Sequence, residues 1–431
     1  MITRLILRNF KSLRKVDVRP QAVNLVIGAN GSGKSNFADA FQFIAQACHL
    51  GLKEALDNLG GLEEVRTRKA GAGKPPQLHV GIELGKDASR GLYRGRYEFT
   101  LSQSKHLEVD TEQLDAEVFP FTPGKPRVQG VPRFKTNARL RLAFTRRRST
   151  IAAWTEDTLG ARPMEADDPQ QLLLHAYGRV GQLRTVANYL GAMRVYNIDA
   201  PLAKHTLNSG EGELARNGAN LIGFVRRALA DEPTAHRLMD RLRDAVPYIE
   251  RIVPDRILSM PTLRFHERDT GLDFFATQVS DGTLRLLGLL AVFLQPAPPP
   301  VVVVEEPENA LHAEALKEFL RSIGSVSQEE QFPTQTFLTS HSPVIADVVL
   351  GLDYQAQVKT TCFVARRREG GATVEEAAPH VMAAIRKNLG RPSDFLREGA
   401  LGEGLRQTKV CDLSEARKRN SSLVTFLEGI A

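Results

Sequence analysis

A glycine-rich segment near the amino terminus has the residue pattern of a phosphate-binding loop. The sequence GANGSGKS at 28–35 follows an apolar run and precedes a stretch with helical periodicity. Its glycines allow backbone N–H groups to surround phosphate oxygens, and the following helix directs its positive end at the same anion. Lys34 would neutralise phosphate oxygens, and Ser35 would place its hydroxyl on Mg²⁺. The pattern predicts phosphate contacts from Asn30, Gly31, Ser32, Gly33, Lys34 and Ser35.

Two adjacent glutamates follow a strongly apolar run. The sequence VVVV at 301–304 reads as a buried strand that ends in Glu305 and Glu306. Strand ends in open α/β sheets are where ligands sit, and neighbouring strand residues point in opposite directions. We therefore expect Glu305 to face the Mg²⁺, although aspartate is the commoner residue there, and Glu306 to act as the base for an attacking water. The alternative is a strand that simply ends in surface acids.

A serine-rich turn at 279–283 precedes an apolar helix at 284–294. Ser280, Asp281 and Gly282 could bind an anion at the start of this helix. Helix N-caps commonly have the same composition, so an ordinary cap is the alternative. The position of the turn, one helix and one loop before the acidic strand, favours the anion-binding interpretation.

His341 follows another apolar strand that ends near Leu338. A histidine at the carboxyl edge of a sheet can hydrogen-bond a γ-phosphate and orient the hydrolytic water. An isolated histidine is more often structural, but this one follows the phosphate loop and the acidic pair. Glu308 is either a first-turn helix acid that the helix dipole favours or a second functional acid.

The elements that would position these groups predict an α/β protein. Strands alternate with helices in the carboxyl-terminal part, which indicates a mainly parallel sheet with helices on its faces. Residues 78–150 are β-rich and residues 168–250 read as short helices, without a sustained heptad. We predict an N-terminal part of one head at 1–110, a β-rich and helical insertion at 111–255, and the C-terminal part of the head with a helical tail at 256–431.

The composition excludes several classes of protein. The 431 residues carry a net charge of +7, which permits a polyanionic partner without requiring one. Cys48, Cys362 and Cys411 lie far apart, which excludes a disulfide framework and a cysteine zinc site. No apolar run approaches 18 residues and the amino terminus is too charged for a secretory signal, so we expect a cytoplasmic protein with no membrane association.

The stretch 118–155 contains no Asp or Glu. Its basic residues could contact DNA phosphates, or they could line the solvated face of a β-hairpin; the sequence favours neither. The candidate DNA contacts are Arg133, Lys135, Arg139, Arg141, Arg146, Arg147 and Arg148.

Taken in this order, the motifs resemble the P-loop, ABC-type ATPase heads of the RecF/SMC group, and more narrowly the small RecF-like AAA-type ATPases. NFKS at 9–12 resembles the start of RecF-like proteins. The other matches are 28–35 to Walker A, 280–283 to the ABC signature, 301–306 to Walker B with its catalytic glutamate, the segment through His312 to the D-loop, His341 to the switch histidine, 193–197 and 214–221 to connector segments, and 393–396 with 399–402 to the C-terminal ending. VSDGT differs from the common signature LSGGQ.

The resemblance implies ATP as substrate, Mg²⁺ as cofactor and slow, partner- or DNA-stimulated hydrolysis. Signature serines of this group bind the γ-phosphate of an ATP held by the opposite subunit, so two heads enclose two ATP molecules and a homodimer is expected. Gln77 is a candidate for the Q-loop residue, and an ordinary loop glutamine is the alternative. Arg66 and Arg68 either approach the nucleotide or belong to a solvated basic loop.

Three functions remain open from the sequence. The first is an ATP-gated switch that binds double-stranded DNA in repair or anti-phage defence. The second is a regulatory or scaffold ATPase that controls a separately encoded nuclease or toxin. The third, the nucleotide-binding subunit of a membrane transporter, is disfavoured by the RecF-like start and by the inserted middle lobe.

Overall fold

The computed structural model describes residues 1–68, 76–103, 107–122, 133–155, 168–179, 181–204, 212–327, 332–342, 345, 349, 358–368 and 371–377. The C-terminal ending and the helical tail predicted from the sequence, together with Cys411, lie outside these ranges. Within them, no helix has the length and apolar character needed to cross a membrane.

A thirteen-stranded sheet runs through the molecule in the order β10-β9-β6-β5-β4-β1-β2-β18-β17-β3-β16-β15-β11. Its strands are β1 (Ile2–Phe10), β2 (Leu13–Val18), β3 (Val23–Ile27), β4 (Leu78–Leu84), β5 (Leu92–Gln103), β6 (Leu107–Val118), β9 (Leu140–Arg147), β10 (Thr150–Trp154), β11 (Arg194–Tyr196), β15 (Val301–Glu305), β16 (Gln335–Ser340), β17 (Thr360–Arg368) and β18 (Gly371–Glu376). Separate small sheets are formed by β7 (Phe121–Thr122) with β8 (Arg133–Phe134), and by β12 (Ile249–Ile257), β13 (Met260–Glu267) and β14 (Asp273–Phe275).

The parallel part of the large sheet joins the two ends of the chain. Strand β3 pairs in parallel with both β16 and β17, and β15 lies between β16 and β11. The predicted α/β fold with its parallel sheet is confirmed, and the two predicted parts of the head share one sheet. Because parallel strands place their carboxyl ends at one edge, residues 28–35, Glu305 and His341 all follow strands at the same edge.

The β-rich segment continues the same sheet in antiparallel fashion. Strands β4, β5, β6, β9 and β10 extend it outward from β1. The proposed bounds at 110/111 and 255/256 fall inside β6 and β12. A residue pattern cannot reveal this continuity, because strand pairing between distant segments is decided by tertiary packing.

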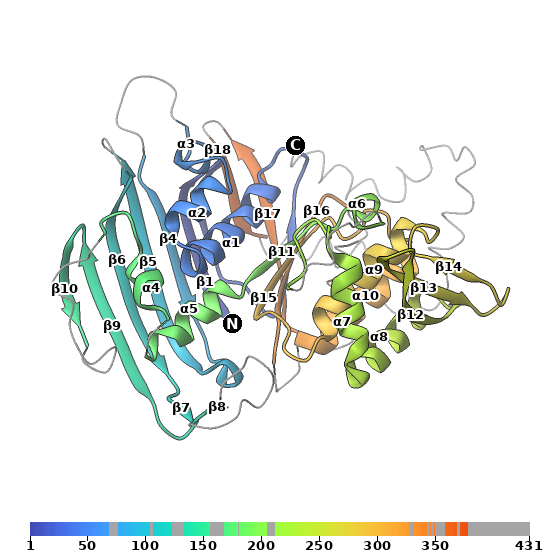
Figure 1. The fold of residues 1–431 in the computed structure, drawn as a ribbon. Coiled ribbons are helices and arrows are strands. Elements are labelled where there is room, and N and C mark those ends of the chain that lie inside the picture. The colour runs from blue at the N-terminus through green and yellow to red at the C-terminus, as the bar shows by residue number, and fades with distance from the viewer. Residues whose placement is uncertain are drawn as a thin grey trace.

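Helices cover both faces of the sheet. They are α1 (Lys34–His49), α2 (Leu52–Asp57), α3 (Leu62–Val65), α4 (Leu173–Tyr177), α5 (Leu183–Gly191), α6 (Ala200–Lys204), α7 (Leu221–Ala230), α8 (Glu232–Ala245), α9 (Asp281–Leu294) and α10 (Ala313–Ser327), with the short 3₁₀ turn η1 (Ala88–Arg90). Figure 1 shows α1, α2, α4 and α5 gathered beside the broad antiparallel part, while α7 to α10 lie beyond β15 with the β12–β14 sheet.

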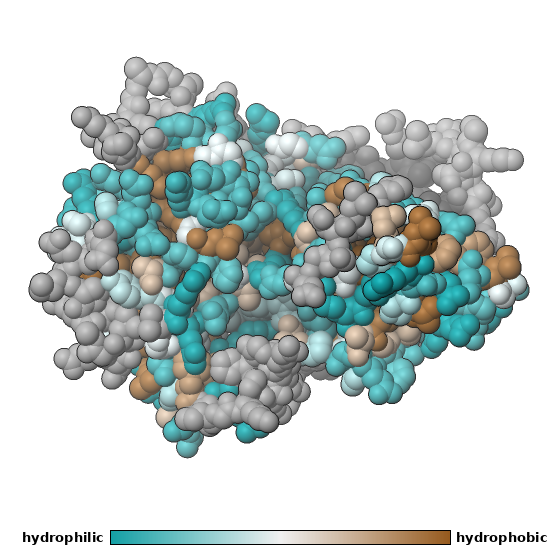
Figure 2. Space-filling view, viewed as in Figure 1, coloured by the Kyte–Doolittle hydropathy of each residue, from teal (hydrophilic) through white to brown (hydrophobic). Residues whose placement is uncertain are grey.

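The valine side chains of β15 point alternately into two hydrophobic cores, one on each face of the sheet. Val301 and Val303 belong to the core that contains α1 and α5, whereas Val302 and Val304 belong to the core that contains α9 and α10. Successive strand side chains point to opposite faces, so an all-valine strand supplies both cores at once. Apolar side chains also remain exposed near the β12–β14 sheet, where Leu258 is 93% exposed, and Figure 2 shows brown residues at this end of the molecule.

Candidate functional site

The segment 28–33 curves tightly between β3 and α1. Gly31 and Gly33 have φ angles of 77° and 103°, in the left-handed region that favours glycine. A Cβ atom at Gly28 would lie 2.5 Å from the Ala365 carbonyl oxygen and 2.6 Å from Ser32 Oγ. Glycine is therefore favoured at positions 28, 31 and 33, and these residues bring the backbone N–H groups of the loop to the start of α1.

Lys34, the first residue of α1, extends its side chain back into this loop. Its Nζ donates to the carbonyl oxygens of Gly28 at 2.7 Å and Ala29 at 2.8 Å. Burial lowers the pKa of this ammonium, while Glu306 and Glu308 raise it. Ser32 Oγ is buried and has no hydrogen-bond partner among the described residues. A cation and an unpartnered hydroxyl at a helix start fit a phosphate group.

Glu305 is held by an arginine. Its Oε1 lies 2.5 Å from Nη2 of Arg216, and Arg216 Nη1 also donates to Asp39 of α1 at 2.7 Å. Lys11 contacts the other oxygen of Asp39 at 2.7 Å. The carboxylate and the exposed Ser35 hydroxyl are oxygen donors of the kind that Mg²⁺ takes, so the residues fit this metal. In this arrangement, Arg216 supplies the positive charge that balances Glu305.

A second group of acidic residues surrounds His341. The Nδ1 atom of His341 lies 3.4 Å from Glu306 and 3.8 Å from Glu308. Ser340 Oγ donates to Glu308 at 2.5 Å, and Asn309 donates to Glu306 at 2.8 Å. Glu306 has a φ of 46°, which is uncommon for a residue with a Cβ and often marks a functional position. The structure thus brings together the predicted base, the predicted switch histidine and Glu308.

The serine-rich turn caps α9, the helix that follows it. Ser280 Oγ accepts from the Thr283 N–H at 3.2 Å, as an N-cap does. Asp281 pairs with Lys204 at 2.6 Å. A Cβ at Gly282 would lie 2.2 Å from the Ala310 carbonyl oxygen, so the turn packs directly against the segment that follows Glu308.

Arg285 connects α9 to the acidic strand end. Its Nη2 donates to the carbonyl oxygens of Glu305 at 3.0 Å and Glu306 at 2.9 Å, and its Nη1 donates to the Ile198 carbonyl at 2.6 Å. Burial lowers the pKa of Arg285, and Glu308 and Glu306 oppose that change. Arg285 was not among the residues predicted from the sequence. The signal was a single charge inside an otherwise apolar helix, because a buried arginine must have partners.

Four of the seven candidate DNA contacts have acidic neighbours on β6. Arg141 pairs with Asp115 at 2.9 Å, and Arg148 lies 3.4 Å from Asp110. Arg139 lies 3.9 Å from Glu117 and stacks over Tyr93. No ion pair with another described residue is recorded for three members of the set. These are Arg133, Lys135 and Arg147.

The structure corrects the prediction for Arg146. Its side chain is fully buried, lies 3.7 Å from Glu112 and donates to the carbonyl oxygens of Arg148, Gln171 and Asp168. Tyr97 also donates to Glu112, at 2.8 Å. Arg146 therefore stabilises the interior of the β-rich part and is inaccessible to DNA. An acid-free stretch of sequence can still face acids, because neighbouring strands come from elsewhere in the chain.

Three residues proposed near the nucleotide contact acidic side chains. Arg66 and Arg68 pair with Glu63 and Glu64 of α3; the Arg68 side chain is exposed, whereas that of Arg66 is largely buried. Gln77 Nε2 lies 3.3 Å from Asp110.

Comparisons with known proteins agree with the fold. Residues 23–347 match the family described as "AAA domain, putative AbiEii toxin, Type IV TA system". The Smc head bound to the C-winged helix domain of ScpA superposes with a TM-score of 0.53 at 13% identity, covering 88% of this chain and 98% of that one. The Smc head of Pyrococcus furiosus with an extended coiled coil, bound to the C-terminal domain of ScpA, gives 0.51 at 12% identity, covering 90% and 99%.

One curated relative matches a shorter region. Urease accessory protein 2 of Cryptococcus neoformans var. grubii is 33% identical over 113 residues, which is 25% of this chain and 9% of that protein. The AAA-domain match, in contrast, spans most of the chain and coincides with the P-loop, the acidic strand end and the histidine strand. The protein therefore belongs to this AAA-domain family, and its fold is that of SMC head domains.

Proposed function

We propose that the protein is an ATP-hydrolysing switch in which two heads pair around ATP, and that this pairing is coupled to DNA binding in repair or anti-phage defence. The observation that carries the proposal is the link through Arg285. The buried Arg285 side chain ties α9, the signature helix that follows the turn at 280–283, to the carbonyl oxygens of Glu305 and Glu306. Changes at the signature turn are thereby transmitted to the groups that would act on ATP.

The roles of the chain's own residues follow from their positions. Lys34 balances phosphate charge at the start of α1, and Glu306, beside His341, accepts a proton from the attacking water. Glu305 and Ser35 would hold Mg²⁺, which when bound neutralises phosphate charge. Asn309 donates to Glu306 and so orients its carboxylate.

The position of Ser280 supports pairing between two copies of the chain. Helix α1, which follows the P-loop, belongs to one core, whereas α9, which Ser280 caps, belongs to the core on the opposite face of the sheet. Among the described residues, no hydrogen bond or ion pair joins 280–282 to 28–35. A second head can supply the phosphate group that this turn would bind, so a homodimer follows.

A regulatory role with a separately encoded effector protein is the second candidate. The ion pairs between residues 139–148 and β6 neutralise four of the seven candidate DNA contacts, which weakens the argument for DNA and favours a protein partner. Retention of a nuclease or toxin by the purified ATP-bound protein, with no ATP-dependent DNA binding, would select this candidate.

Light scattering with and without ATP tests head pairing. Wild type should form dimers with ATP and Mg²⁺, and Lys34→Ala should remain monomeric because it loses nucleotide. Ser280→Arg should bind ATP normally and fail to dimerise. Ser280→Ala is the matched control, because it also removes the N-cap, worth about 1 kcal/mol, without adding bulk. Normal dimers of Ser280→Arg would overturn the pairing scheme.

A further inference from the structure

A cavity of about 200 Å³ lies between the antiparallel part of the sheet and the helical part. It is on the opposite edge of the sheet from the P-loop, because Pro300 precedes the first residue of β15 and Glu305 is its last. The proline-rich linker 296–300, which joins the signature helix to the acidic strand, forms part of its wall. The lining residues used below are Arg90, Thr185, Asn188, Tyr189, Arg194 and Gln295.

Fixed contacts build the cavity walls. Arg90 of η1 donates to the carbonyl oxygens of Pro298 at 2.7 Å and Pro333 at 2.8 Å, while Asp87 holds it at 2.7 Å. At one end, Phe134 packs so closely on Gly91 that a Cβ there would lie 2.1 Å from the ring. The linker and η1 are therefore held in place before any ligand arrives, which is the condition for a preformed site.

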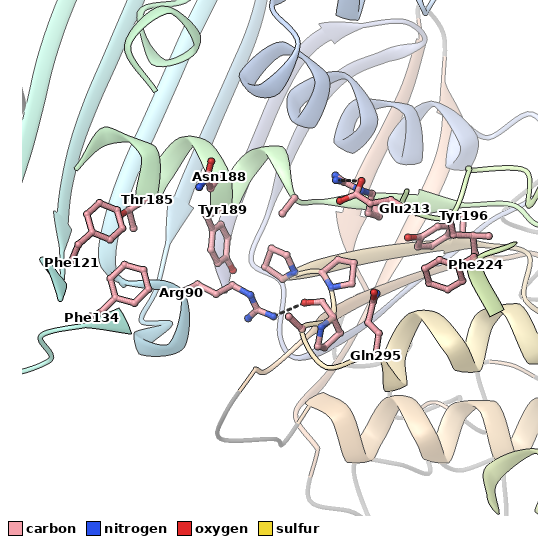
Figure 3. Close-up of a pocket in the computed structure, with 17 residues that line it drawn as sticks. Arg90, Phe121, Phe134, Thr185, Asn188, Tyr189, Tyr196, Glu213, Phe224 and Gln295 are labelled. Carbon is pink, nitrogen blue, oxygen red and sulfur yellow. Dashed lines mark hydrogen bonds and ion pairs between the residues drawn. The ribbon is translucent and has the colours of Figure 1, made fainter. Parts of the chain in front are cut away.

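Two buried hydroxyls in the lining have no partner. Tyr189 and Thr185 lie on α5 and are 2% and 4% exposed, and neither Tyr189 OH nor Thr185 Oγ1 has a hydrogen bond among the described residues. Figure 3 shows the Tyr189 ring extending from α5 toward Arg90, with Asn188 and Thr185 on the same helix. A buried polar group without a partner destabilises the folded protein, and a ligand that hydrogen-bonds this group would remove that cost.

The charges in the lining are already paired. Arg90 pairs with Asp87, and Arg194 pairs with Glu213. Among the described residues that line the cavity, no arginine is left to balance a phosphate or carboxylate. The uncharged amides of Asn188 and Gln295 also belong to the lining. These features select an uncharged ligand with hydrogen-bonding edges.

Aromatic rings and prolines form the remaining walls. Phe121 and Phe134 lie at one end of the cavity, Tyr196 and Phe224 lie at the other, and prolines lie between them (Figure 3). Flat apolar walls favour flat ligands. A cavity of about 150 Å³ accommodates benzene, so this larger volume suits a fused two-ring molecule.

We propose that this cavity is a second ligand site that binds an uncharged planar heterocycle of purine-base size. The ligand packs against the flat apolar wall beside α5 and hydrogen-bonds Tyr189 OH and Thr185 Oγ1. It touches the linker between the signature helix and the acidic strand, far from the P-loop. The site does not depend on head pairing or on hydrolysis.

Calorimetric titration tests the site with the P-loop saturated by a non-hydrolysable ATP analogue and Mg²⁺. The probes are adenine and hypoxanthine, with adenosine monophosphate as the phosphorylated counterpart. We expect one base per chain and at least tenfold weaker binding of the monophosphate, since its charge meets no unpaired cation. Absence of binding by either base, or equal affinity for the monophosphate, would overturn the proposal.

Two variants assign binding to the cavity. Tyr189→Phe removes one hydroxyl and should weaken base binding about fivefold to tenfold, and Ala192→Leu should abolish it by filling the cavity. Both should keep the wild-type affinity for the ATP analogue, which shows that the chain is folded. Asn197→Leu, outside this cavity, is the matched control. Unchanged base affinity in Ala192→Leu would place the binding elsewhere and refute the assignment.

Discussion

The guanidinium of Arg216 lies 2.5 Å from the carboxylate of Glu305, at the end of the buried strand β15. The same guanidinium reaches Asp39 on α1, so one side chain ties the connector segment to the strand and to the helix that follows the P-loop. Glu305 is only 3% exposed, and a buried carboxylate needs such a partner. Arg216 lies in the connector segment 214–221 predicted from the sequence, but the residue pattern did not indicate this contact.

Arg216→Ala should reduce the free energy of unfolding by about 1–3 kcal/mol, because it leaves the buried Glu305 carboxylate without its hydrogen-bonding cation. In a double-mutant cycle, Glu305→Gln should recover part of that loss, which urea unfolding would measure. Arg4→Ala, which breaks the more exposed pair with Asp17, is the control and should cost about 0–1 kcal/mol. If the changes in unfolding free energy of the Arg216 and Glu305 substitutions are strictly additive, the ion pair contributes nothing to stability.

Glu306→Gln should lower the rate of ATP hydrolysis by about 10²- to 10⁴-fold and leave ATP affinity intact, because it removes only the proton acceptor. A phosphate-release assay, with and without double-stranded DNA, measures the rate. The variant should accumulate ATP-bound dimers. Glu314→Gln, on an exposed site of α10, is the matched control and should hydrolyse ATP normally. Equal rates for wild type and Glu306→Gln would reject the base assignment.

Arg146→Leu should destabilise the β-rich part, and more at pH 8 than at pH 5. Burial raises the pKa of Glu112, while hydrogen bonds and Arg146 oppose that change. Removing Arg146 raises this pKa further. A carboxyl whose pKa is higher in the folded chain than in the unfolded chain contributes stability when the pH is below its unfolded-state pKa of about 4.3. That contribution is lost as the pH rises through its folded-state pKa.

The expected loss of unfolding free energy in Arg146→Leu is about 3 kcal/mol at pH 8. Urea unfolding at both pH values measures it. The double variant Arg146→Leu with Glu112→Gln lacks the titrating group, so its stability difference from wild type should change less between the two pH values. An equal loss at pH 5 and pH 8 in the single variant would contradict this account.

DNA binding, if it uses the basic stretch, should depend on the three residues without a recorded ion pair. Replacing Arg133, Lys135 and Arg147 with Gln should lower the slope of log affinity against log salt by about 2.7, if each contacts one phosphate. Fluorescence anisotropy with duplex DNA measures this slope. The matched triple replaces Arg139, Arg141 and Arg148, which face acids, and should change the slope less. Equal slopes in wild type and the first triple would remove DNA contact from this surface.

The local motifs were predictable from the sequence because their requirements are local. A tight phosphate loop needs glycines at 31 and 33, where φ is positive, and a strand buried on both faces needs an apolar run such as 301–304. The strand order at one edge then brings His341 and Glu306 together. These features alone pointed to a P-loop ATPase head.

Tertiary structure decided which charges meet. The acid-free stretch looked like a polyanion-binding surface, yet strand pairing sets Arg141 opposite Glu117, with Asp115 close by, and buries Arg146 beside Glu112. Arg216 and Arg285 found their partners 89 and 20 residues away. Long-range pairing depends on which strands and helices pack together, and this is a property of the whole chain. The sequence therefore determined the motifs predicted to bind nucleotide, and the fold determined the ion pairs, the buried links between motifs and the cavity beside the linker.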